Sequence, residues 1–373
     1  MGFVYRNLVR PVLFQFEPET VHKYAKKAVL EISKSEYLLD RISHHYCLDE
    51  KRLHTNVFGL DFPNPVGLAA GYDKNGEMID FLAALGFGYL NIGSVTAEEN
   101  PGNEGRRAWR LPDDYAALNR YGLNSEGCEK VYARLKGKRF GVPVVVNIAK
   151  NNDPKITGYD AIEDYLKSFR KLYSIADIIE INISCPNTSD GRTFEEPENL
   201  DKLLYHIKRE EDWLICMGKR PIVIKFSPDN DYGKLDEMIS VCENYGIDGY
   251  TIANASKKWE DLKTDKRILD EIIKKYGCIG LSGKPIRDKT TKMIGRVYRR
   301  TKGEKPIMGC GGIFSAEDGI IKMLHGASLL QVCTGLPYEG PSMPKEMNKG
   351  FLNYMEIMGL ERISDIEGML VDL

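Results

Sequence analysis

Asparagine and lysine side chains recur where short apolar runs of the sequence end. Asn147, Asn182 and Asn254 each lie at or near the end of such a run, Lys225 interrupts a fourth, and Lys74 follows a fifth. A carboxamide both donates and accepts hydrogen bonds, which suits rings whose edges alternate C=O and N–H, such as flavins and pyrimidines. A single asparagine of this kind is usually a turn former, and each lysine has an alternative interpretation as a snorkelling surface residue. Three asparagines on separate runs favour a binding site.

Cys185 is the candidate for proton chemistry. It lies in Asn182-Ile-Ser-Cys-Pro-Asn-Thr188, directly after an apolar run. A thiol has an unperturbed pKa of about 8.5 and becomes a base at neutral pH only when its surroundings lower that value. The alternative is a small hydrophobic residue, but the polar neighbours favour a functional thiol. The polar stretch 189–192 that follows has the composition of a mobile lid.

The apolar runs alternate with longer amphipathic stretches from residue 62 onward. Several runs are almost continuously apolar, as strands covered on both faces must be. This alternation predicts a (β/α)₈ barrel, with a doubly wound open sheet as the alternative, because periodicity does not show closure. The predicted strands are Asn64–Ala69, Tyr89–Val95, Pro143–Ile148, Asp177–Ile183, Pro221–Phe226, Gly249–Ala253, Pro306–Cys310 and Leu329–Cys333. The predicted helical stretches are Met78–Leu85, Ile162–Tyr173, Leu200–Trp213, Leu235–Tyr245 and Ile320–Leu324, the last with a capping-box-like start at Ser315 and Asp318.

In such barrels the active site lies at the carboxyl ends of the strands. Gly311-Gly312 follows the seventh predicted strand and Thr334-Gly335 the eighth, which is the usual barrel position for binding a phosphate through backbone N–H groups. These pairs predict a phosphate-bearing ligand, although glycine pairs also form ordinary turns.

Residues 1–46 precede the barrel pattern. Phe3–Phe16 and Val21–Ile32 are predicted to be helical, and the first of them is rich in large apolar residues with Arg6 and Arg10 among them. One interpretation is a helix packed against the barrel, and the other is a membrane-surface or ligand-tunnel element.

Composition excludes several other classes of protein. The 373 residues include 52 Lys plus Arg and 54 Asp plus Glu, so the net charge of −2 argues against a nucleic-acid partner. The eight cysteines are scattered without a C-x-x-C pair, which indicates reduced thiols and no metal site. No run reaches the roughly 18 apolar residues of a spanning helix, and no signal peptide is recognisable at the start.

Taken together, these segments resemble the dihydroorotate dehydrogenases, flavin enzymes of pyrimidine synthesis. The opening stretch from Leu13 to His22 is similar to the N-terminal helical extension of the class 2, quinone-using enzymes, which forms a tunnel at the membrane surface. The resemblance therefore favours the membrane-side interpretation of residues 1–46, with 47–373 as the barrel. The matching motifs are Asn64-Pro-Val-Gly-Leu-Ala-Ala-Gly-Tyr-Asp-Lys74, Ile92-Gly-Ser-Val-Thr96, Asn119-Arg-Tyr-Gly-Leu-Asn124, the Asn182–Thr188 loop, Leu281-Ser-Gly-Lys-Pro285 and Gly326-Ala-Ser-Leu-Leu-Gln331.

The resemblance implies a role for each matching position. Cys185 would be the catalytic base that removes the C5 proton of dihydroorotate as hydride leaves C6, and His22 and Arg110 would lie on the side of a membrane quinone. Substrate contacts are implied at Lys74, Asn124, Asn182, Asn187 and Asn254. FMN contacts are implied at Ala69, Ala70, Gly71, Lys74, Ser94, Asn147, Asn182, Lys225, Ala253, Gly283, Gly312, Cys333 and Thr334. The same resemblance implies a peripheral membrane protein, on the cytoplasmic face in a bacterium, and leaves the oligomeric state open.

The chain departs from the class 2 pattern at three places. Class 2 enzymes carry serine as the base where this chain has Cys185, and Glu180-Ile-Asn-Ile-Ser-Cys185 is similar to the soluble class 1 enzymes. The usual Thr-Asn-Thr is Ala253-Asn254-Ala255, and a tyrosine usual between flavin and quinone is Cys333. Two alternatives therefore accompany the leading hypothesis: a sibling FMN oxidoreductase that acts on another pyrimidine or lactam or uses a non-quinone acceptor, and a non-catalytic flavin-binding protein.

Overall fold

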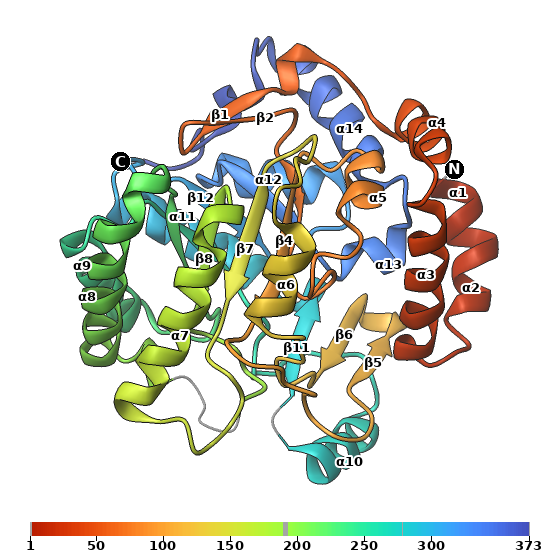
Figure 1. Cartoon of the computed structure of the whole chain (residues 1–373). Helices are drawn as coiled ribbons and strands as arrows, with labels where there is room; N and C mark the ends of the chain where they lie inside the picture. Colours follow the sequence, from red (N-terminus) through yellow and green to blue (C-terminus); the bar gives the residue numbers. More distant parts are fainter. Residues whose placement is uncertain (1, 189–192, 278, 373) are drawn as a thin grey trace.

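The core of the chain is a closed barrel of eight parallel strands (Figure 1), seen in a computed structural model that describes residues 2–188, 193–277 and 279–372. Each predicted strand segment contains one barrel strand, so the (β/α)₈ prediction is confirmed and the open-sheet alternative is wrong. The proposed lid at 189–192 lies outside the described residues. The barrel strands are β3 (Val66–Leu68), β4 (Tyr89–Val95), β7 (Val144–Ile148), β8 (Ile178–Asn182), β9 (Ile222–Phe226), β10 (Gly249–Ile252), β12 (Ile307–Cys310) and β13 (Leu329–Val332). Pairing of β9 with β10 completes the ring between β8 and β12.

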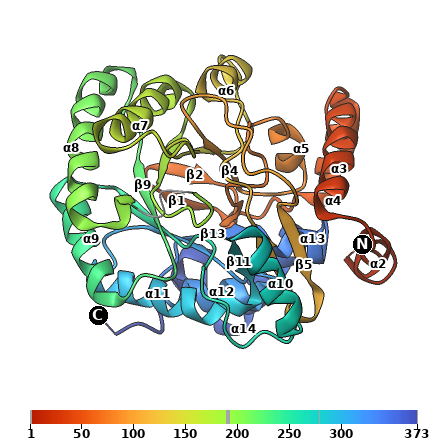
Figure 2. The ribbon, with the colours of Figure 1, turned by 90° about the horizontal axis from the view of Figure 1, so that it is seen from below.

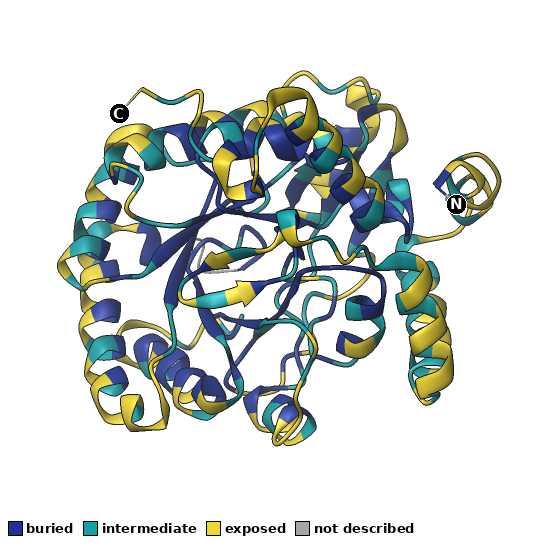
Figure 3. Cartoon of the chain, turned by 90° about the horizontal axis from the view of Figure 1, so that it is seen from above, coloured by how far each residue is buried: buried dark blue, intermediate teal, exposed yellow. Residues whose placement is uncertain are grey.

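Helices surround the strands and expose their outer faces (Figure 3). The Ser315 capping box at the start of α12 is present as predicted, with Asp318 as its second member. The surrounding helices are α5 (Ile79–Ala84), α6 (Cys128–Leu135), α7 (Gly158–Leu172), α8 (Pro197–Leu214), α9 (Tyr232–Asn244), α11 (Arg287–Arg300), α12 (Ala316–Leu324) and α14 (Met343–Met358), and the short α13 (Gly335–Glu339) follows β13.

The amino end of the barrel is closed by an apolar plug beneath the hairpin of β1 (Thr55–Val57) and β2 (Leu60–Phe62). Phe62 packs edge-on against Tyr89, the first residue of β4, with ring centroids 5.5 Å apart. The plug comprises Val57, Phe62, Tyr89, Val145, Ile178, Val223, Met308 and Leu329, all at most 7% exposed. Because this end is sealed by apolar side chains, a polar ligand must enter from the carboxyl end.

A small antiparallel sheet stands at the carboxyl end, where Figure 2 shows β5 and β11 close to α10 (Lys266–Tyr276). Its strands are β5 (Ala108–Leu111), β6 (Ala116–Asn119) and β11 (Gly280–Gly283), with β6 in the middle. The strands belong to insertions after β4 and β10, and they have their own apolar cluster around Trp109, Leu118 and Leu281.

The first 46 residues form helices along one side of the barrel, beside β5 and α13 (Figure 1). The segment from Gly2 to Leu13 is helical through α1 (Gly2–Val4), η1 (Tyr5–Val9) and α2 (Arg10–Leu13), and it is followed by α3 (Pro18–Ile32) and α4 (Glu36–Tyr46). The first two predicted helices are therefore present, and α4 was not predicted. Phe3 is 74% exposed and Leu8 66%, so large apolar groups of this segment face away from the barrel.

Candidate active site

Because the side chains of each strand alternate in direction, the interior of the barrel consists of layers of side chains. Successive side chains of a strand point to opposite faces, so residues two apart share a face. On β8, Ile178 belongs to the plug, Glu180 lies one layer above it, and Asn182 stands at the mouth. The same two-residue step gives the middle layer Asn91, Asn147, Glu180, Lys225, Thr251, Cys310 and Gln331. The mouth of the barrel therefore rests on a polar layer, and that layer rests on the apolar plug.

Three of the predicted asparagine and serine contacts meet at the mouth. Asn182 Nδ2 donates to Ser94 Oγ at 3.0 Å, and Asn182 Oδ1 accepts from Asn254 Nδ2 at 3.1 Å. Asn254 also donates to Ser184 Oγ at 3.2 Å, and the Ser184 hydroxyl donates to the Lys225 carbonyl at 2.8 Å. Four strands therefore contribute to one connected network.

Lys74 and Asn124 form a second cluster. Lys74 Nζ donates to Asn124 Oδ1 at 2.5 Å and lies 3.6 Å from the centre of the Tyr121 ring. Burial, followed by repulsion from Arg107, lowers the pKa of Lys74 to about 7, although nearby Cys185 acts in the opposite direction. The charge of this ammonium group therefore titrates near neutral pH. Tyr121 was not predicted as a site residue.

Cys185 and Asn187 lie in the loop after β8. The Cys185 side chain is partly exposed, and its charge acts on Lys74, so the predicted base and the predicted substrate lysine are neighbours. Asn187 Nδ2 donates to Asn119 Oδ1 on β6 at 2.6 Å, which ties the loop to the small sheet.

The predicted phosphate corner, Gly311-Gly312 after β12 and Thr334-Gly335 after β13, lies beside the end of β11. Thr334 Oγ1 donates to Ser282 Oγ at 2.9 Å, which links two of the three segments. Gly283 has φ +107°, and a Cβ there would lie 2.4 Å from the Tyr115 carbonyl oxygen. Gly312 has φ +72°, and a Cβ there would lie 2.4 Å from Arg287 Cβ. Both positions therefore require glycine, which brings backbone rather than side chain to the corner.

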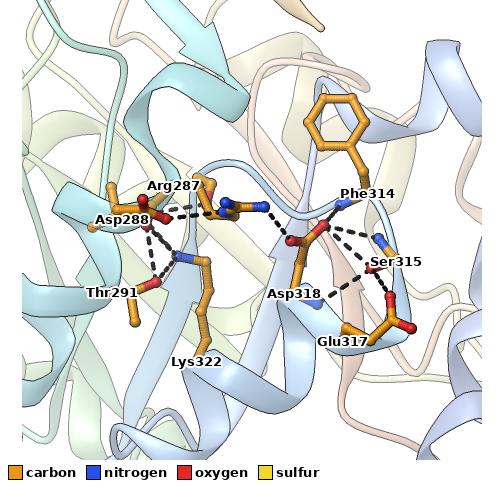
Figure 4. A network of polar contacts seen from close by, with 10 residues as sticks. Arg287, Asp288, Thr291, Phe314, Ser315, Glu317, Asp318 and Lys322 are labelled. Carbon is orange, nitrogen blue, oxygen red and sulfur yellow. Dashed lines mark hydrogen bonds and ion pairs between the residues drawn. The ribbon is translucent and has the colours of Figure 1, made fainter.

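A polar network that includes Arg287, the neighbour of Gly312, fixes this corner (Figure 4). Asp318 Oδ2 accepts from Phe314 N at 2.9 Å and Ser315 N at 3.2 Å, and its other oxygen accepts from Arg287 Nη1 at 3.1 Å. Lys322 is fully buried and donates to the hydroxyl groups of Thr290 and Thr291, and burial lowers its pKa to about 7. The network joins α11 to α12, so the glycine loop between them is held from outside the barrel.

The predicted quinone-side residues contact the N-terminal helices. Arg110 on β5 donates to the Phe16 carbonyl at 2.7 Å and lies 4.6 Å from the centre of the Phe14 ring. His22 on α3 packs edge-on against Tyr72 at 5.3 Å, and burial lowers its pKa. A further link was not predicted: Glu19 accepts from Arg107 Nε at 2.8 Å and forms an ion pair with it. The first 46 residues are thus in contact with the segment that carries Tyr121 and Asn124.

The structure brings the remaining predicted positions to the same end of the barrel. Ala69, Ala70 and Gly71 follow β3, Ala253 follows β10, and Cys333 follows β13. Reasoning from the sequence singled out Asn147 and Lys225 but missed that they belong to a polar layer around Glu180, which is fully buried. A signal was available, because a polar residue occurs in most of the strands two positions after the plug residue.

Within the described protein, four buried amide oxygens of the middle layer and the loop after β8 lack a hydrogen-bond partner: Asn91 Oδ1, Asn147 Oδ1, Asn187 Oδ1 and Gln331 Oε1. Buried polar atoms are usually satisfied, so the unpaired oxygens of Asn147 and Asn187, both predicted site residues, fit a bound molecule with N–H groups, as a flavin or a pyrimidine has. Among the described residues, no group of three or more His, Cys, Asp or Glu side chains is placed to hold a metal ion.

Comparison with known proteins agrees with this geometry. Residues 52–355 match the family described as "Dihydroorotate dehydrogenase". A curated relative from Gloeobacter violaceus, named "Dihydroorotate dehydrogenase (quinone)", is 36% identical over 97% of this chain and 98% of its own. A relative of the same name from Natronomonas pharaonis is 37% identical over 97% and 98%. The crystal structure of DHODH from Eimeria tenella in complex with ferulenol superimposes with a TM-score of 0.83 at 28% identity, covering 95% of both chains.

Proposed function

The chain belongs to the dihydroorotate dehydrogenase family, and from this premise we propose how its residues oxidise dihydroorotate to orotate in pyrimidine synthesis and deliver the electrons to a quinone. The family is flavin-dependent, and we assign FMN as the flavin. When bound, FMN supplies the acceptor for the hydride from C6 of the substrate and the two-electron donor for the quinone.

The FMN site consists of residues from the strand ends. Gly283, Gly312 and Thr334 hold the phosphate through backbone N–H groups, in a corner braced by Asp318. Asn147 and Lys225 hold the polar edge of the ring from the middle layer. The further contacts are Ala69, Ala70, Gly71, Lys74, Ser94, Asn182, Ala253 and Cys333.

Dihydroorotate binds between the Lys74–Asn124 cluster and the asparagine network. Lys74 supplies a positive charge for the substrate carboxylate, and the carboxamides of Asn124, Asn182, Asn187 and Asn254 hold the ring. Cys185, partly exposed in the loop after β8, takes the C5 proton on its sulfur. The ammonium group of Lys74 lies within electrostatic range of Cys185 and favours the thiolate that this step requires.

The quinone reaches the flavin from the side of the N-terminal helices. Arg110 and His22 lie there. Arg110 contacts Phe14 and Phe16, and His22 contacts Tyr72. The exposed apolar side chains of residues 1–46, such as Phe3 and Leu8, provide a surface for peripheral membrane contact. No helix among the described residues is long and apolar enough to cross a bilayer. We assign residues 1–46 to this role and 47–373 to the FMN-binding barrel.

The observation that carries these assignments is the convergence of Lys74, Asn124, Asn182 and Asn254 beside Cys185 at one end of the barrel. The test is to release the bound cofactor with acid and to assay the holoenzyme with dihydroorotate and a panel of quinone, fumarate and NAD acceptors. We expect about one FMN per chain and turnover with a quinone. A colourless protein that does not bind added FMN would contradict the cofactor assignment, and turnover with fumarate or NAD alone would contradict the quinone assignment.

A further inference from the structure

A buried carboxylate lies directly below the proposed flavin site. The Glu180 side chain is 0% exposed, and polar side chains from four other strands of the barrel contact it. Its oxygens accept from Thr251 Oγ1 at 2.5 Å, Gln331 Nε2 at 3.3 Å and Asn147 Nδ2, and they lie 3.5 Å from Lys225 Nζ. Two of these partners, Asn147 and Lys225, are proposed flavin contacts.

We propose that Glu180 is a positioning residue for the flavin, which keeps Lys225 charged and Asn147 oriented and thereby limits the number of protons taken up when the flavin is reduced. The inference rests on the proposed function, which assigns Asn147 and Lys225 to the flavin site. Glu180 acts through these two residues and does not itself reach the mouth, because it lies one layer below Asn182 on β8.

Burial alone would favour the uncharged forms of both Glu180 and Lys225. Lys225 is 5% exposed, and desolvation disfavours an ammonium group in such a place. Burial has the largest single effect and lowers the pKa of Lys225, and the attraction of Glu180 is the largest effect that opposes burial; the net result is a raised pKa. The pKa of Glu180 is lowered, since Lys225 and the hydrogen bonds from Thr251 and Asn147 outweigh its own burial. Each member therefore keeps the other ionised.

The other titratable groups acting on Lys225 do not replace this carboxylate. They are Cys310 on β12 and Cys333 after β13. Burial raises the pKa of both thiols, that of Cys333 to about 11, so both are uncharged at neutral pH. The remaining neighbours in the layer are amides and a hydroxyl group. Without Glu180, Lys225 would face the oxidised flavin with no negative charge close by and would lose its proton.

The loss of that proton has a measurable consequence. In a Glu180→Gln variant, Lys225 is neutral while the flavin is oxidised and regains a proton when two electrons make the flavin negative. The two-electron reduction then consumes one proton more than in the parent enzyme. Each additional proton steepens the pH dependence of a two-electron potential by about 30 mV per pH unit. We expect this extra slope between about pH 6.5 and 8.5 in redox titrations of the holoenzyme.

Three further variants test whether the Glu180–Lys225 pair causes the steeper pH dependence of the potential. The Glu180→Gln/Lys225→Gln double variant lacks the amine and should return to the parent slope. Lys225→Gln leaves Glu180 buried without its counter-charge, so the carboxyl group should be protonated in both redox states and the slope should stay that of the parent enzyme. Glu211→Gln is the matched control, because Glu211 is also buried and paired with a lysine, Lys208, but lies on α8 outside the barrel. It should keep the parent slope.

Lys74 also titrates near neutral pH, but it is present in every variant, so its contribution cancels in the comparison. A Glu180→Gln enzyme with the parent slope would overturn the inference. If that variant does not retain flavin, a steeper slope in Lys225→Gln overturns it instead, because it would show that Glu180 is ionised without Lys225. Failure of the proposed function is distinguishable, because it appears as an unmodified holoenzyme whose flavin is not reduced by dihydroorotate.

Discussion

The charge on Lys74 is expected to make ligand affinity depend on pH. The pKa of this lysine lies at about 7 because the side chain is buried and Arg107 repels it. The group is protonated below that pH and neutral above it. If the carboxylate of orotate binds only the protonated form, the apparent dissociation constant scales with the inverse of the protonated fraction. That fraction falls from about nine tenths at pH 6 to about one tenth at pH 8, so affinity should weaken about tenfold over this range.

Orotate titrations of the oxidised holoenzyme, followed by the change in flavin absorbance, measure this constant directly. Lys74→Arg is the matched variant, because a guanidinium stays protonated throughout this range. Its affinity should be nearly independent of pH, whatever its absolute value. Lys74→Met should bind weakly at every pH. A parent enzyme whose affinity changes less than about twofold between pH 6 and 8 would show that Lys74 of the ligand-free holoenzyme stays charged over this range or that the ligand does not contact it.

Four further outcomes are expected. Cys185→Ala should retain FMN but slow reduction of the flavin by dihydroorotate about 10²–10⁴-fold in stopped-flow measurements, the usual contribution of a general base, and a rate within a few-fold of the parent would exclude the thiol. Cys185→Ser should be active only at higher pH, since a hydroxyl is a weaker acid than a thiol. Deletion of residues 1–46 should impair quinone turnover more than flavin reduction, whereas intact quinone turnover would refute the tunnel assignment. Asp318→Ala should lower the free energy of unfolding by about 1–3 kcal/mol and weaken FMN binding, because it leaves the buried Phe314 N–H unpaired; the exposed Glu317→Ala is the control.

The strands of the barrel were predictable because their apolar runs are short, regular and bounded by turn residues. The segments that were missed have a different character. β5, β6 and β11 are four-residue strands, each drawn from an insertion, and pairing between Ala117 and Ser282 joins residues 165 positions apart. No local pattern encodes such a pairing. α11 was missed for another reason. Its exposed face is so rich in Lys and Arg that the apolar pattern formed by buried residues such as Ile294 and Val297 is hard to recognise in the sequence.

The residues of the candidate site likewise include some that were predictable from the sequence and some that were not. Residues at strand ends, such as Asn182 and Asn254, were predictable from position alone, because the fold brings all carboxyl ends together. Tyr121 and Glu19 were not predictable, because each matters through a contact with a distant part of the chain. Tyr121 contacts Lys74, and Glu19 contacts Arg107. The division at residue 46 and the individual ligand contacts stay predictions.

Lys74 and Cys185 are needed in forms that are favoured at opposite ends of the pH range, and the proximity of the two groups widens the range in which both forms are present. Substrate binding requires the ammonium form of Lys74, which is lost as pH rises through about 7, whereas proton removal requires the thiolate form of Cys185, which is lost as pH falls. Two such requirements produce a bell-shaped dependence of kcat/KM on pH. Because attraction between the two charges is mutual, each favours the ionised form of the other and the active range broadens. Replacing Lys74 by arginine should therefore extend the alkaline limb, while the acid limb, set by the thiol, stays in place.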